Sequence, residues 1–340
     1  MGVSLVGVGS IVVDGRAGRL RRQTVRQASP GRSGARVTIG VPLFRSIRTM
    51  RRTVLYAGLA LLVAACASSP DGRSGTPAKE TLYVVNDASR LIAINGGRPG
   101  VALSDRALAG LQPGERILGI DYRVARGQLF ALGSSGILYR IDTATATASQ
   151  VGGVIPVPMR GNEFGFDFNP TVDRIRVVSD AGLNLRLHPD TGAVVDGDPN
   201  AEGLQPDAPL AWAPGDRNAG RPLSIVAAAY SYGKVDPRIT THYAIDAANG
   251  LLVMQGSREG ATPVVSPHTG RITTVGPLRA GTFARASFDI ADASNAAYAA
   301  FSRAFGNESV LYRIDLATGA ATRLGVVAGG RAVAGLAIEP

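Results

Sequence analysis

A short motif recurs along this chain, and its recurrence restricts the folds that the chain can adopt. "YRID" stands at Tyr139–Asp142 and again at Tyr312–Asp315, and "YAID" lies between them at Tyr243–Asp246. A turn-forming segment, "TAT" or "LATG", follows the first and last copies. Internal repetition of this kind is typical of proteins built from repeated supersecondary units. The chain is therefore expected to contain several copies of one small unit.

Longer segments align around the motif. Units that start at Gly119, Gly165 and Ser287 each begin with an apolar residue, an aspartate and another apolar residue, and continue as short strands separated by tight turns. This pattern predicts one antiparallel sheet of four strands per unit. Residues 223–276 form a more divergent copy. The alanine-rich stretch Ala293–Phe305 has helical propensity, but it aligns with "RGQLFALG" of the first unit, so we predict a strand there.

The two ends of the chain match complementary parts of one unit. "GLAIEP" at Gly335–Pro340 matches only the opening strand, and "TLYVVNDASRLIAIN" at Thr81–Asn95 matches only the middle strands. Joined, the two ends complete a fifth unit, which is how a ring of sheets hides its open edges. The sequence thus predicts an all-β fold: a β-propeller of five blades, each of four antiparallel strands, closed by pairing of the N- and C-terminal strands. Six blades are the alternative.

The motif itself is interpreted as turn chemistry. Its tyrosine and isoleucine alternate with the strand period and are expected to pack between blades. Its aspartate ends the strand, where a short carboxylate can accept hydrogen bonds from the backbone amides of the following turn. We assign this structural role to Asp142, Asp246 and Asp315 in preference to a ligand role.

Three stretches carry a resemblance to a known family. "GIDYRVARGQLFALGSSGILYRID", "GFDFNPTVDRIRVVSDAGLNLRLHPDTGAV" and "APGDRNAGRP…IVAAAYS" resemble the bacterial domain-of-unknown-function 4394 (DUF4394) family. The resemblance covers about residues 80–340, and "GFDFNPTVDRIRVVSDAGLNLR" is its most specific part. It implies a secreted, propeller-like protein. It implies no activity, so no catalytic residues carry over from it.

A segment near the N-terminus indicates where the protein is sent. "MRRTVLYAGLALLVAACASS" starts at Met50 and holds two arginines, an apolar run to residue 65, and Cys66. This is the layout of a signal peptide, too short to span a bilayer stably, and "VAAC" resembles the lipobox of bacterial lipoproteins. The sequence predicts that Cys66 is lipidated and anchors the protein to the membrane. A short membrane anchor with an incidental cysteine is the alternative.

The same segment divides the chain. We expect residues 1–49 to be a gene-model extension or a disordered leader, residues 50–65 the lipoprotein signal peptide, residues 66–79 a flexible linker and residues 80–340 the β-propeller domain. No aspartate follows Cys66, so the inner-membrane retention signal is missing. The expected location is the bacterial cell envelope, on the outer membrane and facing the periplasm. Cys66 is the only cysteine, which excludes an intrachain disulfide.

The net charge of +10 does not indicate a nucleic-acid partner. The whole excess lies in the first 65 residues, where Asp14 is the only acid, and the rest of the chain has equal numbers of basic and acidic residues. A nucleic-acid-binding domain needs a basic surface of its own. We therefore expect no nucleic-acid partner.

Candidate chemistry is sparse. The three histidines, His188, His242 and His268, lack the spacing of a helical metal pair and are expected at the surface or in turns. No recognisable nucleophile or phosphate-binding motif occurs in the propeller. We therefore predict no catalytic residues by motif.

Aspartates recur on the first strand of three blades. Asp121, Asp167 and Asp289 could converge at the central channel, where neighbouring carboxylates would raise one another's pKa, as in glycosidase pairs. The alternative is structural: each caps its own strand or pairs with an arginine such as Arg123 or Arg174. Repetition from blade to blade favours the structural interpretation.

One loop resembles a calcium site. "DGDPNAEGLQPD" places Asp196, Asp198 and Asn200 at alternate positions, which can bring oxygen ligands to one side of a tight loop. It departs from the known calcium-loop pattern, because Ala201 stands where glycine is expected and Pro199 stiffens the loop. A plain polar loop is favoured, with Ca²⁺ as the only cofactor considered.

Two classes of function follow. The first is a non-catalytic, membrane-tethered binding or scaffold module whose partner is a protein or a cell-envelope polymer. The alternative is a propeller hydrolase that acts on a carbohydrate or lactone through channel carboxylates or a divalent metal.

Overall fold

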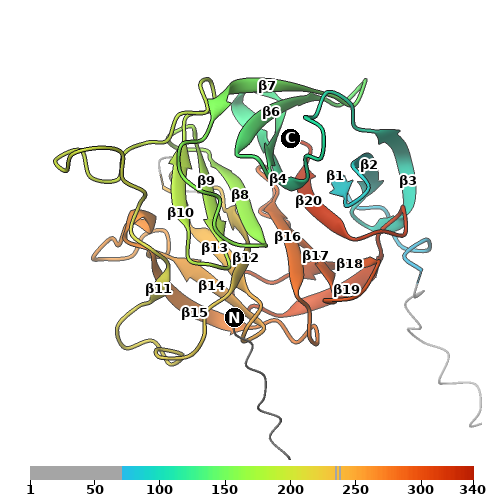
Figure 1. Cartoon of the computed structure of the whole chain (residues 1–340). Coiled ribbons are helices and arrows are strands. Elements are labelled where there is room, and N and C mark those ends of the chain that lie inside the picture. The colour runs from blue at the N-terminus through green and yellow to red at the C-terminus, as the bar shows by residue number, and fades with distance from the viewer. Residues whose placement is uncertain (1–70, 234–235, 237–238) are drawn as a thin grey trace, which may run out of the picture. The chain divides into compact units, whose positions relative to one another are not determined.

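The repeated units fold into five sheets arranged as blades around a central axis (Figure 1). The computed structural model describes residues 71–340 except 234–235 and 237–238. The predicted leader, the signal peptide and Cys66 therefore lie outside the described residues. The predicted all-β propeller of five blades is confirmed, and the only helices in the described part are two 3₁₀ turns, η1 (Val124–Arg126) and η2 (Pro267–Thr269).

Three blades have the predicted four strands. The closing blade contains β20 (Val333–Ile338), β1 (Thr81–Asn86), β2 (Arg90–Asn95) and β3 (Arg98–Ala107). The next contains β4 (Ile117–Arg123), β5 (Gln128–Gly133), β6 (Ile137–Asp142) and β7 (Thr147–Val154). The last contains β16 (Arg285–Ile290), β17 (Ala297–Ser302), β18 (Ser309–Ile314) and β19 (Ala321–Val326). The strand predicted in the alanine-rich stretch is β17, so that prediction is confirmed.

The other two blades depart from four strands. One has only β8 (Phe164–Asn169), β9 (Arg174–Ser179) and β10 (Asn184–Leu187). Its neighbour contains β12 (Ile225–Tyr230), β13 (His242–Asp246), β14 (Leu251–Gln255) and β15 (Arg271–Pro277), with β11 (Ala211–Trp212) added as a fifth strand parallel to β15.

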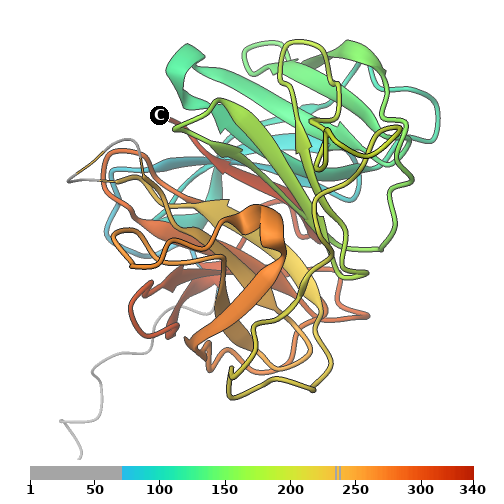
Figure 2. The ribbon, with the colours of Figure 1, turned by 90° about the vertical axis from the view of Figure 1, so that its left-hand side faces the viewer.

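The segment between β10 and β11 explains the difference. It contains Pro199, Pro206 and Pro209, and proline cannot donate to a strand ladder. Beyond β10, the sheet of β8, β9 and β10 is continued only by one isolated bridge, between Leu187 and Val194. The segment then leaves that blade, runs outside the strands, olive-coloured in Figure 2, and joins the edge of the next sheet as β11.

The predicted closure of the ring is confirmed. β1 and β20 pair antiparallel, with Leu82 opposite Ile338 and Val84 opposite Leu336. Leu82, Val84, Leu336 and Ile338 are all buried, so the closing pair also contributes to the core. Strands from the two ends of the propeller domain therefore share one blade.

The strands nearest the axis pack unusually close together. All seven residues of β4 and all six of β12 are buried. A Cβ at Gly119 would lie 2.6 Å from Cβ of Phe166, and a Cβ at Gly165 would lie 2.6 Å from the backbone nitrogen of Ala228. Glycine is needed there because neighbouring inner strands approach within the space of a methyl group.

The structural role of the motif aspartates is confirmed. Oδ1 of Asp142 accepts hydrogen bonds from the N–H groups of Ala144 and Thr145. Asp315 accepts two backbone N–H bonds in the same way in its own turn. Asp246 accepts one from Ala248 in its turn and another from Ser224, which precedes β12. Tyr139 of the first copy is fully buried, as expected for a residue that packs between blades.

The described part of the predicted linker contacts the closing blade. The N–H of Gly100 donates to the carbonyl of Gly72, and Nε of Arg98 donates to the carbonyl of Gly75. The N–H of Ala78 donates to Oδ1 of Asn95. No helix in the described range is long and apolar enough to cross a membrane.

Candidate functional site

The three aspartates predicted to face the channel do meet. Asp121 lies on β4, Asp167 on β8 and Asp289 on β16, and one carboxylate oxygen from each lies within 4.8 Å of the others. No other group of three or more His, Cys, Asp or Glu side chains in the described ranges is this compact. We call these residues the channel aspartates. The inner strands β12 and β20 carry alanine at the matching positions, Ala229 and Ala337.

Each channel aspartate bonds to the inner strand of the following blade. Its Oδ2 accepts the backbone N–H of the residue that follows the matching position there. The pairs are Phe168 to Asp121 (2.7 Å), Tyr230 to Asp167 (2.8 Å) and Ile338 to Asp289 (2.6 Å). These N–H groups point away from their own sheets, so a carboxylate is their acceptor. The aspartates therefore join blade to blade, a role that differs from both structural alternatives raised above.

The carboxyl groups perturb one another strongly. Burial and the charge of Asp289 raise the pKa of Asp121 well above its usual range. Burial and the charges of Asp121 and Asp289 do the same to the pKa of Asp167. Burial raises the pKa of Asp289 to about 6. Each of the three carboxyl groups therefore holds a proton more readily than an exposed aspartate does.

The channel around the aspartates is closed. All three are at most 5% exposed. The adjoining cavity, lined by inner-strand residues such as Gly119, Phe166 and Phe288, has a volume of only about 10 Å³. That is about the space for one water molecule. Burial and the negative charge of the channel aspartates raise the pKa of the nearby Tyr232 phenol. The cluster can hold a proton or a small cation, but it offers no room for a sugar or a lactone.

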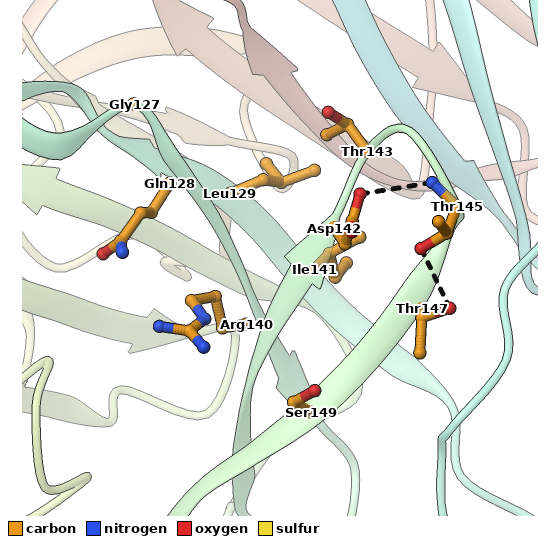
Figure 3. A pocket seen from close by; sticks show the side chains of 10 residues that line it. All are labelled: Gly127, Gln128, Leu129, Arg140, Ile141, Asp142, Thr143, Thr145, Thr147 and Ser149. Atoms are coloured by element: carbon orange, nitrogen blue, oxygen red, sulfur yellow. Dashed lines mark hydrogen bonds between the residues drawn. The ribbon is translucent and has the colours of Figure 1, made fainter.

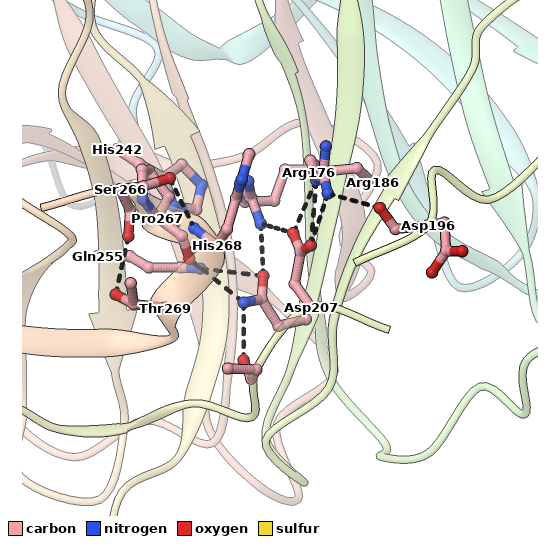
Figure 4. Close-up of polar contacts among 12 residues, drawn as sticks. Arg176, Arg186, Asp196, Asp207, His242, Gln255, Ser266, Pro267, His268 and Thr269 are labelled. Atoms are coloured by element: carbon pink, nitrogen blue, oxygen red, sulfur yellow. Dashed lines mark hydrogen bonds and ion pairs between the residues drawn. The ribbon is translucent and has the colours of Figure 1, made fainter. Parts of the chain in front are cut away.

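The calcium-like loop is held by its own turns. Oδ1 of Asp196 accepts from the N–H groups of Asp198 and Gln205, and Oδ1 of Asp198 accepts from the N–H of Asn200. Asp207, at the end of the loop, points away and binds arginines (Figure 4). Asp196, Asp198 and Asn200 stay candidate metal ligands on sequence grounds alone.

Asp207 is part of a buried polar network that we did not predict from the sequence (Figure 4). Asp207 pairs with Arg176 on β9 and Arg186 on β10, and its side chain is only 1% exposed. Arg176 also donates to the Tyr230 hydroxyl and to Oδ1 of Asn184. A buried charge requires partners. The sequence feature that could have predicted this network is the presence of two arginines, Arg176 and Arg186, in strands of the repeat that are expected to be buried.

One histidine corrects the expectation of surface positions. His242 is only 1% exposed, at the start of β13, where its ring lies 4.3 Å from that of Tyr230. Nδ1 of His242 lies 3.1 Å from Oε1 of Gln255, and Nε2 has no partner among the described residues. Burial and the charge of Arg176 hold the pKa of His242 well below its usual range. The apolar interior of the blade therefore keeps this imidazole neutral.

Open hollows occur elsewhere on the propeller. One, of about 560 Å³, lies over β5–β7 and is lined by polar side chains, including Arg140, Asp142 and Ser149 (Figure 3). Asp142 there bonds the following turn. A second, of about 270 Å³, lies where inner strands β4, β8, β16 and β20 begin, at the opposite end of these strands from the channel aspartates. We call it the mouth funnel. Its charged residues Arg116, Glu163 and Arg285 carried no signal in the repeat pattern.

Comparisons with known proteins match this chain to one family. The family model described as "Domain of unknown function (DUF4394)" matches residues 90–337. A search of curated proteins gave no match. Similar solved structures include a structural genomics protein of unknown function from Bacteroides thetaiotaomicron, at 14% identity and a TM-score of 0.39, with 75% of this chain and 61% of that chain covered.

Two further structures have comparable similarity. A protein from Lactobacillus plantarum has 15% identity and a TM-score of 0.32, with 76% of this chain and 71% of that chain covered. Glutaminyl cyclase from Myxococcus xanthus has 11% identity and a TM-score of 0.37, with 66% and 90% covered. Similarity at this level assigns no function.

Proposed function

Because the chain belongs to the DUF4394 family, a family of unknown function, we propose its role from its own residues. The protein is a lipid-anchored, non-catalytic binding or scaffold propeller of the bacterial cell envelope. It is tethered through Cys66 to the outer membrane and faces the periplasm. Its partner is a protein or a cell-envelope polymer.

The use of the channel aspartates carries the non-catalytic part of this proposal. A propeller glycosidase needs two carboxyl groups that reach a substrate, one on each side of the scissile bond. Here the three carboxyl groups accept backbone N–H bonds between blades and adjoin a cavity of about 10 Å³. Substrate would have to break the contacts that join the inner strands. This argument favours a structural role over hydrolysis.

The sequence around Cys66 supports the tether. Two arginines, a short apolar run and the "VAAC" box precede a polar stretch, "ASSPDGRSG", whose residues Gly72 and Gly75 bond to the closing blade, so the proposed anchor stands a few residues from the propeller. Cys66→Ala is expected to move the protein from the membrane fraction to the soluble periplasmic fraction. Cys66→Ala protein that stays with the membrane would contradict lipid anchoring.

One experiment separates binding from hydrolysis. The soluble domain is incubated with isolated peptidoglycan and with outer-membrane vesicles, then sedimented, and the supernatant is assayed for released sugars and for opening of added lactones. The proposal expects co-sedimentation with one of these materials and no turnover. Turnover that disappears in Asp121→Asn or Asp167→Asn, while the melting curve stays cooperative, would establish the hydrolase alternative.

A further inference from the structure

The mouth funnel combines an apolar floor with a charged rim. Ile117, Leu118 and Phe164, from the first positions of β4 and β8, are buried and line the floor. Arg116 and Glu163, each immediately before one of these strands, stand at the rim. A concave site with an apolar floor and a few charged groups is the usual form of a small-molecule site. Its volume of about 270 Å³ suits a molecule of a few to about a dozen heavy atoms.

Two acids of the funnel already have partners. Asp87 pairs with Arg331, at 2.7 Å between Oδ1 and Nε. Glu115 accepts hydrogen bonds from the hydroxyls of Ser134, Ser135 and Tyr139, and from one backbone N–H. These bonds lower the pKa of Glu115, which therefore stays ionised through the neutral range. Neither acid needs a further cation.

The two arginines of the funnel, Arg116 and Arg285, have fewer polar partners than Glu115. Nε of Arg285 pairs with Oε1 of Glu163 at 3.1 Å. Arg116 is exposed, and its guanidinium makes no hydrogen bond or ion pair within the described ranges. The rim therefore has one cation without a partner when Glu163 is ionised, and two when Glu163 is protonated.

Glu163 is poised to change charge near neutral pH. Burial raises its pKa to about 7, against the opposing charge of Arg285. Asp180, after β9, raises this pKa further, and Arg116 lowers it. The charged groups that face Glu163 are thus Arg285, Asp180 and Arg116, from three different blades. Protonation of Glu163 releases Arg285 for another anion.

We propose that the mouth funnel binds a small organic acid, with Arg116, joined by Arg285 when Glu163 is protonated, holding its carboxylate and the apolar floor taking its carbon skeleton. A carboxylate fits better than a phosphate dianion, because Asp87, Glu115 and Glu163 also line the funnel and would repel a second negative charge. The site is additional to the partner-binding role proposed above and does not depend on it.

Isothermal titration calorimetry tests the proposal with sodium butyrate, sodium lactate and sodium glucuronate at pH 6. Glucose is the neutral match for glucuronate, and sodium chloride keeps the ionic strength equal. A charge-assisted hydrogen bond to Arg116 should make glucuronate, or another of the acids, bind about tenfold or more tightly than glucose. No binding of any of the three acids at pH 6, or equal binding of glucose, overturns the proposal.

Variants locate the site. Arg116→Gln should weaken acid binding about tenfold or more. Arg126→Gln, an exposed arginine just beyond the other end of β4, removes the same charge and should leave binding unchanged. Equal weakening by both variants, or none by Arg116→Gln, would contradict binding in the funnel.

The pH dependence tests the part played by Glu163. If the acid binds only when Glu163 is protonated, affinity should fall about tenfold from pH 6 to pH 8. Glu163→Gln should keep binding at pH 6 and remove most of that fall. A fall of the same size in Glu163→Gln would show that another group controls the affinity and would contradict the release of Arg285.

Discussion

Asp289 should stabilise the folded protein more at pH 5 than at pH 8, because it binds a proton in the folded channel at pH values where the unfolded chain has released it. The pKa of Asp289 is about 6 in the folded protein, against an ordinary value near 3.8. A carboxyl group with a raised folded-state pKa stabilises the protein when protonated, and this contribution is lost as the pH rises through the folded-state value. The relevant window therefore runs from about pH 4 to about pH 7.

The expected size follows from these two values. Linkage for Asp289 alone gives a free energy of unfolding larger at pH 5 than at pH 8 by about 1 kcal/mol. Asp121 and Asp167, with pKa values raised well above their usual range, add to it in the same direction. The lowered pKa of Glu115 acts oppositely, but only at pH values below its ordinary range near 4.5. The lowered pKa values of His242 and His268 also act oppositely, as the pH falls through the ordinary histidine value of 6.5. The contribution of Asp289 is therefore isolated by comparing the wild type with a variant of Asp289.

Urea unfolding at pH 5, 6, 7 and 8 measures this directly. Asp289→Asn keeps a side-chain oxygen for the N–H of Ile338 but removes the charge. Between pH 5 and pH 8, the free energy of unfolding of the wild type should therefore fall by about 1 kcal/mol more than that of the variant. Asp142→Asn, in an exposed turn, is the control and should keep the wild-type slope. Equal pH dependence of the wild type and Asp289→Asn would refute the reasoning.

Three further outcomes are expected. Deleting Gly335–Pro340 removes most of β20, and with it the buried side chains of Leu336 and Ile338, whose burial contributes about 1.5–3 kcal/mol per side chain. The truncated domain should therefore lose cooperative melting, and normal melting would contradict the closure. Asp207→Ala leaves Arg176 buried without its carboxylate and should cost about 3–5 kcal/mol in urea unfolding, whereas a loss below 1 kcal/mol would mean that the network is dispensable. Calcium chloride should raise the melting temperature no more than sodium chloride of equal ionic strength; a specific rise abolished in Asp196→Ala would establish the loop as a metal site.

The repeat made the architecture predictable. Residues that recur with the same spacing and the same alternation must occupy equivalent positions, so aligning "YRID" with its copies placed the strands and their turns. Complementary fragments at the two ends predicted the pairing of β1 with β20. Local propensity alone would have made the stretch around Tyr298 a helix, and the repeat overrode it.

Departures from the repeat were not predictable in the same way. The segment after β10 follows no copy, and its prolines led the chain to β11 in the neighbouring sheet. Arg116 and Glu163 each precede an inner strand, and Arg285 is the first residue of a third, so only the ring brings them together. His242 reads as a polar strand end, but its burial depends on Tyr230 and Gln255 from other strands. Contacts between blades have no signature in a single copy of a repeat.

The convergence of the channel aspartates was predictable, but the hydrogen bonds that they make to the neighbouring inner strands were not. Their recurrence on the first strand of each unit indicated a common place at the axis. Whether a carboxylate at that place faces an open channel or a neighbouring N–H depends on how closely the inner strands approach. Gly119 and Gly165 permit that approach, and only the packed ring shows it.

Amide hydrogen exchange, measured residue by residue by NMR, tests most directly whether the channel aspartates join the blades. The backbone N–H groups of Phe168, Tyr230 and Ile338 depend on these carboxylates for their hydrogen bonds. We predict slow exchange for all three in the wild type, and faster exchange of Phe168 alone in Asp121→Ala, with a cooperative melting curve retained. Fast exchange of all three amides in the wild-type protein would show that the carboxylates face solvent, and would contradict the account.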